Sequence, residues 1–150
     1  MITYQKGDMF EADVEALVNT VNTVGAMGKG LALLFKNKFP ANNERYVNGC
    51  RNNEVKTGEM FVVEITGRGN LRYIVNFPTK EHWRHPSQMV WIEEGLIDLR
   101  RFILDNNVKS IAIPALGAGL GGLSWPAVKN EIENKLADLQ DVQIMVFEPL

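Results

Sequence analysis

The chain has 150 residues, of which 45% are hydrophobic and 23% charged, and its formal net charge is −2. These values suit a globular domain with a real core, and they argue against a membrane-spanning protein and a broadly basic nucleic-acid binder. The single cysteine, Cys50, and an N-terminus without the apolar core of a signal peptide predict a reducing compartment, with the cytoplasm as the default.

The first half of the chain alternates strand-like and helix-like patterns. The segment Glu15–Thr20 is nearly all apolar, which predicts a strand at the centre of a sheet. In chain order we expect strands at Ile2–Gln5 and Glu15–Thr20, helices at Gly30–Lys38 and Asn42–Arg51, and strands at Glu59–Ile65 and Tyr73–Phe77. A turn rich in glycine, residues 67–70, separates the last two strands.

The second half continues the alternation. We expect a long helix opened by Pro86 and Ser87, with Ser87 as its cap. Its inward face is expected to carry Val90, Ile92, Leu96, Leu99 and Ile103. A strand at Ser110–Pro114, a helix at Trp125–Leu139 capped by Ser124 and a strand at Val142–Phe147 complete the chain. The order predicts an α/β fold, a three-layer α/β/α domain over residues 1–150 with a mixed, largely parallel sheet.

In such sheets ligands bind in the loops that follow the carboxyl ends of strands. Two of these loops, residues 19–30 and 114–125, are rich in glycine and each leads into a helix. Glycines allow close backbone approach, and a helix N-terminus offers free N–H groups and a positive dipole end. Together the two loops predict a diphosphate site, although neither matches the Walker or dinucleotide pattern.

The third loop, residues 76–86, is dense in basic, polar and aromatic groups. Lys80 taken alone is more typical of a solvated charge than of a catalyst, and His82, Trp83 and Arg84 are candidates for a local nucleic-acid contact. Two histidines with few companions do not make a metal site, so we expect no metal and no cofactor. Cys50 is expected to serve packing, and Trp83 and Trp125 either stack on a ligand or pack in the core.

Long strings of the chain resemble a known family. Gly7 and Asp8, followed by VNTVNTVGAMGKGLALLFKNKFP, NFPTKEHWRHPS and IPALGAGLGGLSW, resemble the macrodomains, and among them those of DarG-type antitoxins. Those antitoxins reverse ADP-ribosylation of thymine bases in single-stranded DNA by DarT toxins. The resemblance implies an ADP-ribosyl glycohydrolase that acts on such DNA, with a DarT-like toxin as partner. We also expect a monomer, and no membrane partner because the chain has no apolar run long enough to span a bilayer.

The same resemblance assigns roles to residues. It implies that Asp8 and Met9 bind adenine, that Asn22 faces the distal ribose and acts with Lys80 in catalysis, and that Phe147 walls the adenine. The implied contacts to ADP-ribose are Asp8, Met9, Thr20, Asn22, Gly28, Lys29, Gly30, Gly117, Ala118, Gly119, Leu120, Gly121 and Phe147.

The chemistry leaves alternatives open. Cleaving the N-glycosidic bond passes through a transition state with oxocarbenium character, in which Lys80 either attacks as an amine or protonates the leaving base. A relative that acts on ADP-ribosyl-glutamate has an aspartate where this chain has Gly121, and this departure disfavours that substrate. A non-catalytic reader of ADP-ribose is the further alternative, because the glycine loops explain binding without a reaction.

Overall fold

The computed structural model describes all residues from 1 to 150 and contains one sheet of six strands. The strands are β1 (Ile2–Gln5), β2 (Ala16–Asn22), β3 (Phe61–Glu64), β4 (Tyr73–Lys80), β5 (Ser110–Ile113) and β6 (Gln143–Phe147). Their order across the sheet is β1-β6-β5-β2-β4-β3, and only the β3–β4 pair is antiparallel. The sheet is therefore mixed and largely parallel, as predicted, with β2 near its centre.

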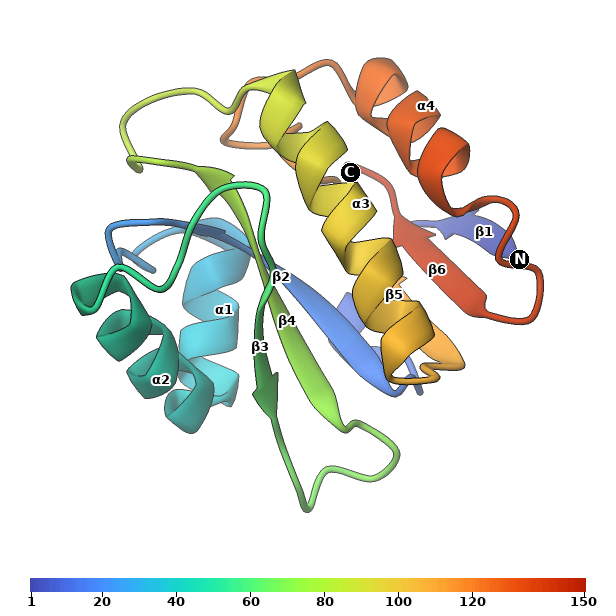
Figure 1. The fold of residues 1–150 in the computed structure, drawn as a ribbon, viewed down its shortest axis with the longest axis horizontal. Helices are drawn as coiled ribbons and strands as arrows, with labels where there is room; N and C mark the ends of the chain where they lie inside the picture. The colour runs from blue at the N-terminus through green and yellow to red at the C-terminus, as the bar shows by residue number, and fades with distance from the viewer.

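Four α-helices and one short 3-10 helix connect the strands. They are η1 (Met9–Glu11), α1 (Gly30–Lys38), α2 (Pro40–Arg51), α3 (Met89–Asp105) and α4 (Trp125–Leu136). Helices α3 and α4 lie together on one face of the sheet (Figure 1), and α1 and α2 pack in the core of the opposite face. This arrangement confirms the three-layer prediction. None of the helices combines the length and the apolar character that crossing a membrane requires.

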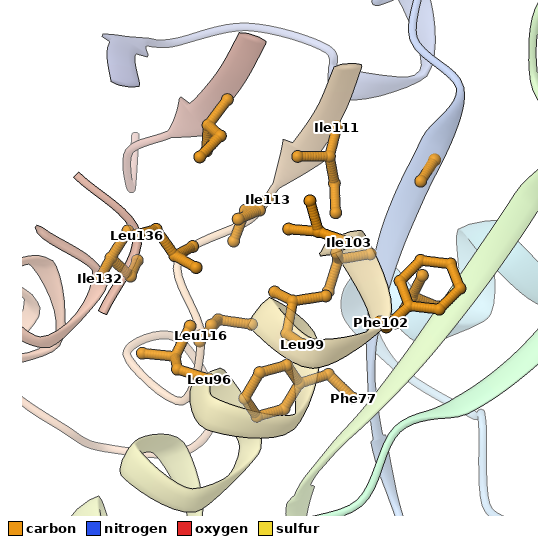
Figure 2. Packing of buried hydrophobic residues seen from close by; sticks show 14 of the residues in the cluster. Phe77, Leu96, Leu99, Phe102, Ile103, Ile111, Ile113, Leu116, Ile132 and Leu136 are labelled. Atoms are coloured by element: carbon orange, nitrogen blue, oxygen red, sulfur yellow. The ribbon is translucent and has the colours of Figure 1, made fainter. Parts of the chain in front are cut away.

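Alternation along the strands divides the core in two. In β2, Ala16 and Val18 join the cluster under α3 and α4, whereas Leu17 and Val21 join the cluster under α1 and α2. Figure 2 shows the first cluster, which contains aliphatic side chains of α3, α4 and β5 together with the Phe77 ring of β4. Because both faces of the sheet are covered, its central strands are apolar on both sides.

Helix α3 approaches β4 closely because it has a glycine at position 95. A Cβ built at Gly95 would overlap the Phe77 ring, so any larger residue would push the helix away from the strand. Ile92, Leu96, Leu99 and Ile103 are buried on the inward face, as predicted. Val90 was predicted to face inward as well and is 43% exposed. Helical geometry explains this error, since Val90 lies two residues from Ile92 and so does not share its face.

Helix α3 also begins later than predicted. Its N-cap is Gln88, and Ser87 is not a cap but a buried residue whose hydroxyl has no hydrogen-bond partner. The N–H of Ser87 donates instead to the carbonyl oxygen of Gly121, at 3.0 Å. Ser124 does occupy the N-cap position of α4, but its side chain makes no capping bond. Helix α4 ends at Leu136, three residues earlier than expected, where a turn leads to β6.

Strand β4 runs three residues further than predicted and passes through Pro78. A proline inside a strand is unusual, because it lacks the N–H donor that a sheet ladder needs. The antiparallel partner β3 pairs with β4 only as far as Asn76, so Pro78 takes no bond away from that side. On the other side β2 continues to pair, with a register shift after Val21. Lys80 is consequently the last residue of a strand and not part of a loop.

Candidate functional site

Three connections meet at the carboxyl edge of the sheet. They follow β2, β4 and β5, which are adjacent and parallel, so all three leave the sheet at the same edge. We call them the first loop (residues 23–29), the hook (residues 81–85) and the second loop (residues 114–124). The hydroxyl of Thr23 donates to the carbonyl oxygen of Glu81 at 2.8 Å, which joins the first loop to the hook. The predicted convergence of these segments is confirmed.

The Asn22 side chain holds the first loop in place through hydrogen bonds to the loop backbone. Its Oδ1 accepts from the backbone N–H groups of Val24, Gly25 and Ala26 at 3.0–3.2 Å, and its Nδ2 donates to the carbonyl oxygen of Ala26 at 2.8 Å. The side chain is 6% exposed. One Nδ2 hydrogen remains without a partner in the chain, because an amide nitrogen carries two. The predicted role of Asn22 toward the ribose stays a prediction, and that hydrogen is the group left to perform it.

Tyr46 of α2 holds Asn22 in place, and sequence reasoning did not identify it. Its buried hydroxyl lies 2.7 Å from the carbonyl oxygen of Asn22 and 3.1 Å from its Oδ1. Burial, more than the nearby Cys50, raises the pKa of Tyr46, so the hydroxyl stays protonated and donates. Burial also raises the pKa of the Cys50 thiol, which lies under Gly25 and agrees with the predicted packing role. Only the fold brings α2 beneath this loop.

The N–H groups that Asn22 leaves free lie further along the chain. The amides from residue 27 to residue 32 donate to no acceptor within the chain, and Lys29, the N-cap of α1, offers no side-chain cap. These unpaired donors sit at a helix N-terminus, where the dipole favours a negative charge. The predicted contacts Gly28, Lys29 and Gly30 all fall within this stretch. Leu31 belongs to the same set of donors.

The second loop supplies another set of free donors. Its amides at Gly119, Leu120 and Gly121 are unpaired, whereas Ala118 donates to the carbonyl oxygen of Ala115 at 3.1 Å. A Cβ added at Gly119 would meet nothing within 4 Å, so open space faces this position. The two loops touch where the Cβ position of Gly30 lies 3.4 Å from Leu120 Cδ1. Free donors of both loops therefore lie on either side of this contact.

Gly121 has no room for a side chain. A Cβ there would overlap the carbonyl oxygen of Gly117 and the hydroxyl of Ser87, and would lie 2.8 Å from the carbonyl carbon of Gly117. Backbone atoms cannot yield as a flexible side chain can. Ser87, which the sequence suggested only as a cap, supports the loop from beneath. An aspartate at position 121 would require a different path for this loop.

Lys80 lies where the second loop meets the hook. Its Nζ donates to the carbonyl oxygen of Leu120 at 3.0 Å and to that of Trp83 at 3.3 Å. An ammonium group has three donors and no acceptor, so one N–H remains for a ligand. In the sheet Lys80 pairs with Asn22 across β4 and β2. The two residues predicted to be catalytic are thus neighbours.

The residues predicted to contact adenine gather further along the same edge. Phe147 ends β6 beside Gln5 of β1, and the segment after β1 carries Asp8 and Met9. Met9 and Phe147 are buried in one cluster, and Asp8 is exposed with Oδ1 accepting the Phe10 N–H at 2.9 Å. Three strand spacings separate β6 from β4, or about 14 Å. The residues predicted to contact adenine and the distal ribose therefore lie three strands apart along this edge of the sheet.

Two further predicted candidates, Thr20 and Trp125, lie on β2 and at the start of α4. Trp125 donates its indole N–H to Glu148 at 3.0 Å, so one of the two predicted stacking residues is tied to the C-terminal segment. Thr20 is half-buried on β2. No group of three or more His, Cys, Asp and Glu side chains is close enough to hold a metal ion.

Comparison with known proteins agrees with this architecture. Residues 18–132 match the model of the Macro domain family, and the chain belongs to that family. It is 53% identical over its whole length to a DNA ADP-ribosyl glycohydrolase of Thermus aquaticus. The chain spans 42% of the length of that relative.

Two solved structures are similar over nearly the whole chain. The macrodomain of Mycobacterium tuberculosis DarG superposes with a TM-score of 0.97 at 47% identity, covering 100% of this chain and 99% of that one. Thermosipho africanus DarTG in complex with ADP-ribose gives a TM-score of 0.92 at 32% identity, covering 99% of this chain and 42% of that one. The resemblance of the sequence to DarG macrodomains is therefore confirmed.

Proposed function

We propose that this macrodomain is a hydrolase that removes ADP-ribose from thymine bases of single-stranded DNA, and so reverses the action of a DarT-like toxin. The observation that carries the proposal is the position of Lys80, which pairs with Asn22 on the neighbouring strand and whose Nζ donates to the second loop. The similarity to a DNA ADP-ribosyl glycohydrolase over the whole chain supports the same reaction. The domain spans residues 1–150 and acts as a monomer in the bacterial cytoplasm.

ADP-ribose lies along the carboxyl edge of the sheet in this proposal. Asp8, Met9 and Phe147 hold the adenine, and Thr20 and Asn22 line the floor near the distal ribose. The diphosphate takes the free N–H groups of Gly28, Lys29 and Gly30 on one side and those of Gly119, Leu120 and Gly121 on the other, with Gly117 and Ala118 shaping the turn. Solved DarTG in complex with ADP-ribose supports this ligand.

Lys80 acts as an acid in the proposed reaction. Two carbonyl oxygens accept from its Nζ, an arrangement suited to an ammonium group. Water adds to the anomeric carbon of the distal ribose while the bond to the thymine nitrogen breaks, and the ammonium gives its proton to the leaving base. The proton that water loses restores the ammonium. The remaining Nδ2 hydrogen of Asn22 orients a ribose hydroxyl.

Gly121 supports DNA over ADP-ribosyl-glutamate as the substrate. An aspartate at this position, as in the glutamate-directed relative, would overlap the backbone of Gly117. The site therefore offers Lys80 without an acidic partner from the second loop.

The test offers the protein two substrates: a single-stranded oligonucleotide with one ADP-ribosyl-thymine, and a protein carrying ADP-ribosyl-glutamate. We expect free ADP-ribose from the oligonucleotide at a rate at least tenfold above that from the protein. An oligonucleotide adduct that stays intact would contradict the proposal. Binding of ADP-ribose without release from either substrate would identify a reader instead.

A further inference from the structure

The hook carries an aromatic and basic cluster that lies outside the residues proposed to bind ADP-ribose. The Trp83 side chain is 44% exposed, which is unusual for so large an apolar group. The imidazole of His82 stacks on its indole with ring centroids 5.5 Å apart, and the Arg84 guanidinium lies 4.7 Å from the indole centroid. His85 continues the row, 5.1 Å from His82. Planar and cationic groups are thus gathered in four consecutive residues.

Hydrogen bonds inside the hook hold its backbone and the His82 ring in place. Nδ1 of His82 accepts the backbone N–H of Arg84 at 3.1 Å, and the N–H of His85 donates to the carbonyl oxygen of His82 at 3.1 Å. The hydroxyl of Thr23 holds Glu81 from the first loop. A surface organised before its ligand arrives loses less conformational entropy on binding. The backbone that carries the exposed indole is therefore organised in advance, and the Arg84 side chain is the group that has to move.

The backbone of Trp83 lies directly beside the reactive group of the proposed reaction. Lys80 Nζ is 3.3 Å from the carbonyl oxygen of Trp83, so the lysine amine contacts the backbone of the residue that carries the indole. Leu120 of the second loop, whose carbonyl oxygen also accepts from Lys80, is 69% exposed. When the modified base of a DNA strand reaches Lys80, the nucleotides next to that base are expected to lie near Trp83 and Leu120.

We propose that Trp83 is a specificity residue, whose indole stacks with the nucleobase adjacent to the modified thymine while Arg84 pairs with the intervening phosphate. This inference rests on the proposed function and extends it to a contact outside the ADP-ribose site. Aromatic side chains stack on bases of any sequence, and arginine adds to such platforms. The Arg84 guanidinium, now over the indole, is the group that a base would displace, and it stays within reach of the phosphate. A nucleic-acid strand, in which a planar base and an anionic phosphate alternate, matches both groups at once.

The test is a binding titration that needs no turnover. Fluorescein-labelled oligothymidylate without any modification is titrated with the native protein, Trp83→Ala, Trp83→Phe and Leu104→Ala, and the anisotropy is followed in low salt. Leu104 is the matched control, since it is an exposed apolar residue at the other end of α3, 55% exposed. We expect Trp83→Ala to weaken binding about tenfold, Trp83→Phe to restore most of the affinity, and Leu104→Ala to change nothing.

A companion assay separates this inference from the proposed function. The same variants are given an ADP-ribosyl-thymidine mononucleotide and a modified oligonucleotide. We expect Trp83→Ala to lower kcat/KM for the oligonucleotide, relative to kcat/KM for the mononucleotide, about tenfold. The loss should come from a higher KM for the oligonucleotide. Equal losses of kcat/KM on both substrates would refute base stacking on Trp83. So would a native protein that does not bind oligothymidylate, or binding that Trp83→Ala leaves unchanged. A native protein that binds the oligonucleotide through Trp83 but releases no ADP-ribose would support base stacking on Trp83 and refute the proposed function.

Discussion

The two ends of the central strands β5, β2 and β4 differ in whether their polar groups are hydrogen-bonded within the chain. At the amino end, Glu15 joins all three strands: its Oε1 accepts the Lys109 N–H at 2.6 Å, its N–H donates to Ser110, and its carbonyl oxygen accepts the N–H groups of Arg72 and Tyr73. At the carboxyl end, the amides of residues 27–32 and 119–121 have no partner in the chain.

This difference separates stability from recognition. Unpaired donors cost stability unless water or a ligand satisfies them, and paired donors cannot recognise anything new. A polar hollow of about 420 Å³ opens at the amino end, but its Glu15 and Arg72 pair with each other and its Asp13 accepts from Asn70. Changes at the carboxyl end are therefore expected to alter ligand binding and turnover, and changes at the amino end to alter unfolding.

The largest expected effect is that of Lys80→Ala. Loss of the proposed acid should slow release of ADP-ribose from modified DNA about 1000-fold. Calorimetry should show an affinity for free ADP-ribose within about threefold of the native value, because the phosphate donors remain. Lys56→Ala is the matched control, as an exposed lysine in the connection between α2 and β3. Release at the native rate by Lys80→Ala would remove Lys80 from the mechanism.

Substitutions at Gly119 should act on binding alone. The position has space for a side chain and no left-handed φ, so Gly119→Ala and Gly119→Val are expected to fold normally. The larger valine should block access to two amides and weaken ADP-ribose binding about 100-fold, for two charge-assisted bonds worth roughly 1.5 kcal/mol each. Alanine should fall between valine and glycine. Calorimetry and a melting curve measure both quantities, and native affinity in Gly119→Val would place the diphosphate elsewhere.

Glu15→Ala should act on unfolding alone. It leaves the Lys109 N–H without its carboxylate acceptor, and we expect a loss of about 2 kcal/mol in the free energy of unfolding at pH 7. Urea denaturation measures this loss, and calorimetry should show unchanged ADP-ribose affinity. A weaker affinity with intact stability would break the division between the two ends.

The effect of Glu15 should depend on pH. The pKa of Glu15 lies below its ordinary value, mainly because its carboxylate accepts the Lys109 N–H. The hydrogen bond from the Arg72 side chain lowers the pKa further, by a smaller amount. A depressed pKa in the folded state means that the contribution is complete above the unfolded pKa of about 4.3. It is lost as the pH falls from there through the lower folded pKa. The stability gap between native protein and Glu15→Gln should thus be present at pH 7 and close in strong acid; a gap that widens in acid would contradict this assignment.

The smallest expected effect is that of Tyr46→Phe. This variant tests whether the first loop needs the hydrogen bonds between Tyr46 and Asn22 in order to bind ADP-ribose. The change removes the hydroxyl that bonds the carbonyl oxygen and Oδ1 of Asn22, and should cost about 1 kcal/mol in the free energy of unfolding. We also expect ADP-ribose affinity to fall by about threefold, because the first loop is held less firmly. Denaturation and calorimetry on the same preparation measure both effects. An unchanged affinity would show that Asn22 holds the loop without Tyr46.

The sequence was enough to predict the layers, the sheet and the meeting of three loops. Alternation of apolar segments determines the elements, and the parallel arrangement that follows from it puts their loops at one edge. Local signals failed where long-range packing decides. Strand β4 can continue through Pro78 because its antiparallel partner β3 has already ended at that point. Ser87 does not cap α3 because it packs against Gly121 instead. Neither fact is visible in the residues next to them.

The candidate site was predicted in part. The glycines marked both loops, but their pattern did not show which N–H groups are free and which are bound by Asn22. Tyr46 lies 24 residues from Asn22 in the chain, and only the packing of α2 brings its hydroxyl there. The roles of the individual residues toward ADP-ribose remain predictions that the experiments above address.

The most direct test of the division between the two ends is an amide-resolved NMR titration of the nitrogen-15-labelled protein with ADP-ribose. We predict that the largest shifts fall on the free amides of Gly28, Gly30, Gly119 and Gly121, while those of Lys109 and Ser110 stay where they are. Shifts centred on Gly69, Lys109 and Ser110, or no shift at saturating ligand, would contradict the assignment of recognition to the carboxyl end of the sheet.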